Sequence, residues 1–154
     1  MANVEIYRPK LEDLWFRQEM MEDQATMSYN HAYGGTIPFP KDKWEEWYNR
    51  YMFDDSKFYA YIKDEDNNFV GSMSYRYDDK DKINKVSILI HAKYRGKGYG
   101  DFALKSLCET AKSRGVKELY DDIAIDNPSI KLFLKNGFIE DHRTDEYIMV
   151  KKVL

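Results

Sequence analysis

Residues 91–104 read HAKYRGKGYGDFAL, and the fold is organised around this stretch. Three glycines, an arginine and a lysine separate the β-rich apolar run at 85–92 from a run whose apolar residues have helical spacing. A loop that opens a helix presents free backbone N–H groups, which bind phosphate oxygens. Glycine permits close approach and positive φ angles, while Arg95 and Lys97 add positive charge. The stretch therefore predicts a cradle for a pyrophosphate group.

Outward from this loop, the chain predicts one α+β domain over residues 1–154. The alternation of strand and helix patterns gives the order β-α-α-β-β-β-loop-α-β-α-β-β. Strands are expected at 4–9, 58–62, 69–77, 85–92 and 116–125, and twice more after Gly137. Helices are expected at 10–21 and 41–52, from the glycine loop to Gly115, and from Asn127 and Pro128 to Gly137.

Composition narrows the class of protein. A hydrophobic content of 43% can fill one core, and the net charge of −3 excludes a broadly basic nucleic-acid-binding protein. No apolar run is long enough to span a membrane, and the N-terminus lacks the layout of a signal peptide. The single Cys108, on an apolar helix stripe, cannot form an internal disulfide. We expect a cytoplasmic protein that binds neither nucleic acid, membrane nor metal.

Several kinds of phosphate-bearing ligand could bind such a loop. The loop is not a Walker A motif. Residues 98–103, GYGDFA, do satisfy the G-x-G-x-x-[G/A] dinucleotide fingerprint, with Asp121 about twenty residues further on. However, too few residues follow the loop to supply the second half of a dinucleotide-binding domain.

Two motifs carry a resemblance to a known family. RGKGYG (95–100) matches the [R/Q]-x-x-G-x-[G/A] loop of the GNAT (Gcn5-related N-acetyltransferase) superfamily, and DNPSIKLFLKNGF (126–138) is similar to its second signature. The resemblance extends over essentially the whole chain. It implies an α/β sandwich, in which helices flank a central mixed, mostly antiparallel sheet. It also implies an acetyl-CoA-dependent N-acetyltransferase, and a homodimer.

The resemblance also implies how acetyl-CoA binds. The strand at 88–90 would pair with the pantetheine arm, and the loop amides would hold the pyrophosphate with Arg95 at its edge. The register of the second signature leaves Asp126 and Asn127 open; an amide can donate to the arm's carbonyls, which favours Asn127. The implied cofactor-binding residues are Ile88, Leu89, Ile90, Arg95, Gly96, Lys97, Gly98, Tyr99, Gly100, Asp126, Asn127, Ser129 and Phe133.

The catalytic groups cannot be transferred from the family by position. Many GNAT enzymes have a tyrosine where this chain has Phe133, and the glutamate expected near residues 86–87 is missing. The remaining candidates for a base are Asp121, Asp122, His91, Tyr75 and Tyr77. Because neighbouring strand residues point to opposite faces, at most one of Asp121 and Asp122 is expected to face the site.

The first two helices and their connection form the expected acceptor wall. Tyr29, Tyr33 and Trp44 are the candidate substrate-binding residues there, and their aromatic faces, near several acidic side chains (Glu22, Asp23, Glu45, Glu46), suit a cationic amine. The alternative is that the aromatic stripe of the second helix packs into the core.

These residues predict transfer of an acetyl group to a primary amine of a small molecule, by direct attack in a ternary complex. A polyamine, an amino acid and an aminoglycoside-like amine are all open as acceptors. Two rivals remain. One is a peptide or protein amine acetyltransferase. The other is an acyl-CoA sensor without turnover, which the residue Phe133 keeps open.

Overall fold

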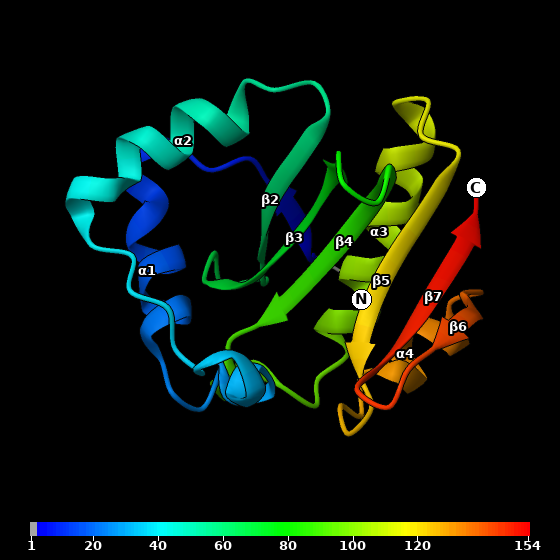
Figure 1. The fold of residues 1–154 in the computed structure, drawn as a ribbon. Helices are drawn as coiled ribbons and strands as arrows, with labels where there is room; N and C mark the ends of the chain where they lie inside the picture. The colour runs from blue at the N-terminus through cyan, green and yellow to red at the C-terminus, as the bar shows by residue number, and fades with distance from the viewer. Residues whose placement is uncertain (1–2) are drawn as a thin grey trace.

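A seven-stranded sheet forms the centre of the molecule (Figure 1). The computed structural model describes residues 3–154, apart from the side chains of Ala32 and Tyr33. The strands are β1 (Glu5–Tyr7), β2 (Lys57–Lys63), β3 (Phe69–Asp78), β4 (Ile83–Ile90), β5 (Glu118–Ala124), β6 (Ile139–Arg143) and β7 (Tyr147–Val153). The α-helices are α1 (Leu14–Glu22), α2 (Trp44–Met52), α3 (Tyr99–Ser113) and α4 (Ile130–Lys135). Short 3-10 turns are η1 (Leu11–Asp13), η2 (Ser28–Tyr33), η3 (Lys41–Lys43) and η4 (Ala92–Tyr94).

The strands run in the order β1-β2-β3-β4-β5-β7-β6, and neighbours are antiparallel except β4 and β5. This confirms the expected mixed, mostly antiparallel sheet flanked by helices. The helix that begins at the glycine loop crosses from β4 to β5, as a parallel pair requires.

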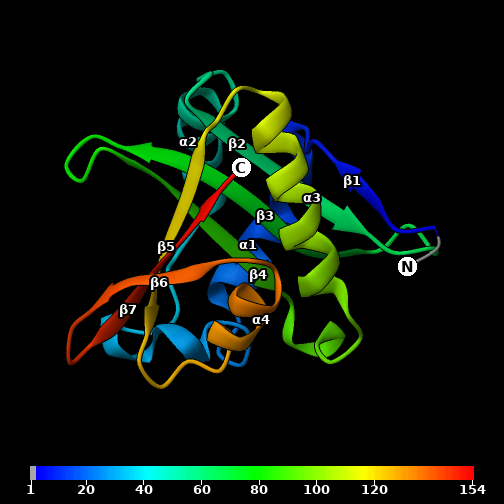
Figure 2. The same cartoon turned by 90° about the vertical axis from the view of Figure 1, so that its right-hand side faces the viewer.

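Two hydrophobic layers cover the two faces of the sheet. Helices α3 and α4 lie on one face and α1 and α2 on the other (Figure 2). Side chains along β3 alternate between the two faces of the sheet. Met73 and Tyr75 pack under α3, while Ser72, Ser74 and Arg76 point to the α1 and α2 side.

Element types and order agree with the sequence-based expectation, while most boundaries differ by a few residues. Two of these differences have a local hydrogen-bonding cause. β4 ends at Ile90, and His91 caps the turn η4 by accepting a hydrogen bond from the Lys93 amide at 3.3 Å. Helix α4 begins at Ile130, because the Asn127 side chain closes a turn on the Ser129 amide before helical bonding starts.

β4 and β5 separate soon after they meet. Their registered pair is Lys85 with Tyr120, and beyond it the two strands diverge toward their C-terminal ends (Figure 1). The sheet is therefore open between the two strands, at the level where the glycine loop leaves β4.

Candidate active site

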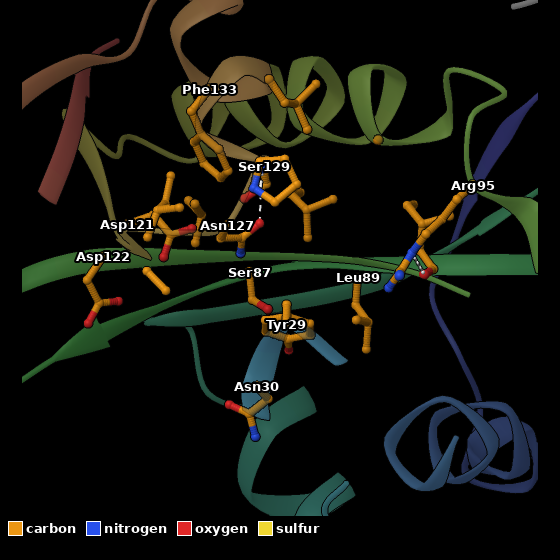
Figure 3. A pocket seen from close by; sticks show the side chains of 18 of the residues that line it. Tyr29, Asn30, Ser87, Leu89, Arg95, Asp121, Asp122, Asn127, Ser129 and Phe133 are labelled. Atoms are coloured by element: carbon orange, nitrogen blue, oxygen red, sulfur yellow. Dashed lines mark hydrogen bonds between the residues drawn. The ribbon is translucent and has the colours of Figure 1, made fainter. Parts of the chain in front are cut away.

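A cavity of about 1160 Å³ occupies the opening between β4 and β5 (Figure 3). Its walls come from both strands, the loop at 94–100, the segment before α4 and the turn η2. Because it passes through the sheet, it receives side chains from both sheet faces. Every implied cofactor-binding residue lines it except Lys97, whose ammonium lies 5.9 Å from the Tyr94 ring centroid instead.

The glycine loop presents a row of free donors to this cavity. Within the described part of the chain, the backbone N–H groups of residues 96–101 donate to no protein acceptor. Gly96 and Gly98 have φ angles of 77° and 89°, which a residue with a Cβ rarely adopts. Gly98 directly precedes α3, so the loop amides and the helix N-terminus favour the same anion. These features fit a diphosphate group.

Arg95 lines the cavity, and its side chain is also held by hydrogen bonds within the protein. Its Nε donates to the Ile90 carbonyl at 3.2 Å, and its terminal nitrogens donate to the carbonyls of Ala25 and Thr26 at 3.3 and 2.6 Å. The guanidinium therefore ties the loop after α1 to the end of β4. Its hydrogen bonds go to backbone carbonyls, so its contribution to anion binding is its charge.

Asn127 and Asp126 differ in which of their side-chain groups remain available to a ligand. The Asn127 side-chain oxygen accepts from the Ser129 amide at 3.0 Å, which leaves its NH₂ group directed away from that bond (Figure 3). The Asp126 carboxylate instead lies within hydrogen-bonding distance, 3.2 Å, of the exposed His31 Nε2. This geometry favours Asn127 as the donor to a bound cofactor arm.

Asp121 and Asp122 both line the cavity, which corrects the expectation that at most one would. They do point in opposite directions, Asp121 toward the Phe133 side (Figure 3), but the cavity passes between the strands and reaches both. Burial, together with repulsion from Asp122, holds the pKa of Asp121 well above its ordinary value. The positive charges of Lys85 and Arg76 oppose this shift.

His91 and Tyr75 lie outside the cavity, so both are withdrawn as catalytic candidates. His91 turns toward α1, where its Nε2 lies 3.3 Å from a Glu19 oxygen. Tyr75 is 2% exposed and stacks on Phe58 under α3, because its position in β3 faces that layer. Tyr77, the lesser alternative, is also outside the cavity walls.

The acceptor wall differs from the expected one. Tyr29 lines the cavity, whereas Trp44 does not: its Nε1 donates to Gln18 and to the Phe39 carbonyl, both at 3.2 Å. The side chain of Tyr33 falls outside the described residues. The acidic side chains near the first two helices (Glu22, Asp23, Glu45, Glu46) are absent from the described walls, so the expected acidic surround is wrong.

The polar cavity residues missed from the sequence include five on or facing the sheet: Tyr51, Ser74, Arg76, Lys85 and Ser87. All but Tyr51 lie on the α1 and α2 face of β3 and β4. The alternation of polar residues in SMSYRY (72–77) was the signal that could have found Ser74 and Arg76. Tyr51 lies on the aromatic stripe of the second helix, and the sequence pattern alone does not distinguish a cavity residue there from a core residue.

The separated parallel strands and the amide-rich loop define a protein that binds a diphosphate-bearing ligand in a cleft of its sheet. The comparisons with known proteins agree with this class. The model of the acetyltransferase (GNAT) family matches residues 13–138, while no curated protein matches the chain by sequence. The chain belongs to the GNAT family and is an acetyl-CoA-dependent N-acetyltransferase.

Two solved structures illustrate the shared fold. A spermidine N-acetyltransferase from Vibrio cholerae, in complex with CoA and spermine, is 18% identical with a TM-score of 0.82, over 99% of this chain and 96% of that one. An N-acetyltransferase from Staphylococcus aureus Mu50 is 21% identical with a TM-score of 0.78, over 99% of each chain. No helix among residues 3–154 is long and apolar enough to cross a membrane.

Proposed function

We propose that the protein transfers the acetyl group of acetyl-CoA to a primary amine of a small molecule, by direct attack in a ternary complex. The observation that carries this proposal is the coincidence, in one cavity, of a row of free loop amides and a carboxyl group of raised pKa, Asp121. The Vibrio cholerae structure, which binds CoA and spermine, supports a small amine as acceptor.

Asp121 is the general base in this proposal. An amine arrives as an ammonium ion and must lose a proton before its lone pair can attack the thioester carbon. A carboxylate whose pKa is raised accepts that proton more readily than an ordinary aspartate. The C–N bond forms and the C–S bond breaks, so that CoA leaves as a thiolate. The acylated nitrogen then releases its second proton, which the thiolate or solvent takes up.

The leaving group needs little help from the protein. Phe133 occupies the place of the family's tyrosine and has no proton to donate. An ordinary thiol has a pKa of about 8.5, so a thiolate can leave near neutral pH without a dedicated acid. The walls hold the two reactants together, and for well-oriented reactants this supplies up to about 7–11 kcal/mol.

A thiol-release assay with acetyl-CoA and a panel of diamines, polyamines and amino acids tests the function, with calorimetry to follow acetyl-CoA binding. Asp121→Asn should lower kcat by about 100-fold at neutral pH, because general bases contribute about 10²–10⁴-fold. The wild type should gain activity as pH rises through the raised pKa of Asp121, and the variant should lose this dependence. Asp145→Asn, in the exposed turn between β6 and β7, is the matched control.

Two outcomes would contradict the proposal. Binding of acetyl-CoA without thiol release from any amine would favour a sensor. Full activity in Asp121→Asn would remove the assigned base. We also propose, from the resemblance, that residues 1–154 form a single domain that acts in the cytoplasm as a homodimer, which sedimentation and expression studies can test.

A further inference from the structure

The acceptor side of the cavity has a floor made by paired strand residues. Tyr59, Ser74 and Ser87 lie side by side across β2, β3 and β4, and Arg76 pairs with Lys85 in the neighbouring row. Both rows point to the α1 and α2 face. The floor therefore extends from the opening beside β5 toward β2, about 5 Å per strand.

Tyr51 lies above the β2 end of this floor, and Arg17 lies close to it. It stacks on Trp47 at 5.0 Å between ring centroids and meets Tyr59 edge-on at 5.8 Å. The Arg17 guanidinium carbon lies over the same two rings, at 4.3 Å from the Trp47 centroid and 5.5 Å from that of Tyr59. Arg17 and Tyr51 thus share one aromatic corner.

The charge of Arg17 has no acidic partner within the described residues. No carboxylate forms an ion pair with it, and its Nε is buried without an acceptor. Aromatic faces hold a guanidinium in place without neutralising it. A preorganised guanidinium is the group that best matches a carboxylate, which it can bind through two parallel hydrogen bonds.

Arg76 is the second cation, and it lines the cavity itself. Its contact with Asp78 is long, at 3.9 Å, and its side chain is half-exposed. Its neighbour Lys85 is already held by Asp78 at 3.2 Å and Asp81 at 3.1 Å. Of these two cations, Arg76 is therefore the one free to meet a ligand.

The charges are consequently separated across the cavity. Asp121 and Asp122 lie on β5, Asp121 toward the Phe133 side and Asp122 toward the opposite side, while Arg76 and Arg17 lie near Tyr51. A second ammonium group of a polyamine would meet two guanidinium groups there, which is unfavourable at short range.

We infer that the acceptor is an amine that also carries a carboxylate, with its amino group toward Asp121 and its carboxylate on Arg76, assisted by Arg17 behind Tyr51. This inference rests on the proposed function and narrows its acceptor class to amino-acid-like molecules. It differs in chemistry from spermine, the ligand bound by the Vibrio cholerae enzyme.

Matched acceptors test the inference directly. L-lysine is cadaverine with one added carboxylate, and L-ornithine is related to putrescine in the same way. We expect kcat/KM to be at least tenfold higher for the carboxylated member of each pair. Arg76→Gln should lower this ratio at least tenfold, chiefly through KM for the amino acid. Arg50→Gln on α2, whose nearest acidic group is Glu46 at 3.8 Å, should leave the ratio unchanged.

Arg17→Gln tests the assisting charge and should lower the same ratio. Because Arg17 also packs on aromatic rings, the thermal unfolding of this variant is measured alongside its activity. The role of Arg76 is tested separately, by Arg76→Gln. Equal or better turnover of the diamines, or an equal loss on both members of a pair in Arg76→Gln, would overturn the inference while leaving the proposed function intact. Absence of thiol release with every acceptor would overturn the proposed function, and this inference with it.

Discussion

Asp121 combines a chemical role with a cost to stability. Its pKa is raised because burial and the nearby Asp122 disfavour its charged form, so the ionised group destabilises the folded state. The unfolded pKa of an aspartate is about 3.9, and below it the group carries no such penalty. The penalty grows as pH rises above that value and is complete once pH has passed the raised folded value. Functional residues commonly impose such a cost.

Asp121→Asn should therefore be more stable than the wild type at pH 8, with the difference shrinking toward pH 4. Asparagine keeps the shape of the side chain but cannot ionise. Thermal unfolding of both proteins at the two pH values measures this. Asp145→Asn should show no comparable gain, and an unchanged or lower Tm for Asp121→Asn at pH 8 would contradict the assignment.

Arg95 shows how one side chain can join distant segments. Its three hydrogen bonds reach the end of β4 and the carbonyls of residues 25–26. A lysine keeps the charge but cannot donate in this forked geometry. Arg95→Lys should lose about 1 kcal/mol of stability, since an intramolecular hydrogen bond contributes about that much net.

For a chain of this length, that loss corresponds to about 2–4 °C in Tm. Differential scanning calorimetry is the measurement. Arg50→Lys is the control, because the partner of Arg50 is an exposed side chain one helical turn away. A Tm equal to that of the wild type would show that the forked hydrogen bonds of Arg95 do not stabilise the fold.

At the scale of elements, the proposed cofactor site depends on the glycines at the start of α3. Gly98 and Gly115 have nearly equal φ angles, 89° and 85°, but stand at opposite ends of the helix. Adding a Cβ strains the backbone by about 1–2 kcal/mol at either position. Only Gly98 lines the cavity.

Gly98→Ala should therefore weaken CoA binding by about tenfold, whereas Gly115→Ala should lose similar stability with CoA affinity unchanged. A tenfold change corresponds to about 1.4 kcal/mol. Isothermal titration of both variants with CoA, below their unfolding temperatures, makes the comparison. If Gly98→Ala kept its affinity within about twofold, the loop would not be the diphosphate cradle.

At the scale of the whole molecule, the open sheet predicts that a ligand in the cavity links its two halves. CoA at 100 times its dissociation constant should stabilise the fold by about 2.7 kcal/mol, because it binds the native state only. This amounts to about 5–10 °C in Tm. Adenosine, which lacks the diphosphate and the pantetheine arm, is the comparison ligand, and an equal shift with adenosine would contradict the assigned binding mode.

Local signals in the sequence account for much of the architecture. The periodicity of apolar residues and the positions of glycine, proline and asparagine determine the type and order of the elements, since those preferences act between residues close in the chain. The same signals located the loop at 95–100 and the core position of Cys108, which is buried on the sheet-facing side of α3. The family signatures then indicated the cofactor.

Tertiary structure decided what each polar side chain does. Arg95 turned to backbone carbonyls, Trp44 to Gln18, and His91 to Glu19, each through a partner that no local pattern specifies. The split between β4 and β5 brought Asp121 and Asp122 into one cavity. The sequence by itself thus determined the class of fold and the phosphate loop. Strand register and the distances between remote segments determined which residues line the cavity, including the proposed base Asp121, and where Arg17 and Arg76 lie.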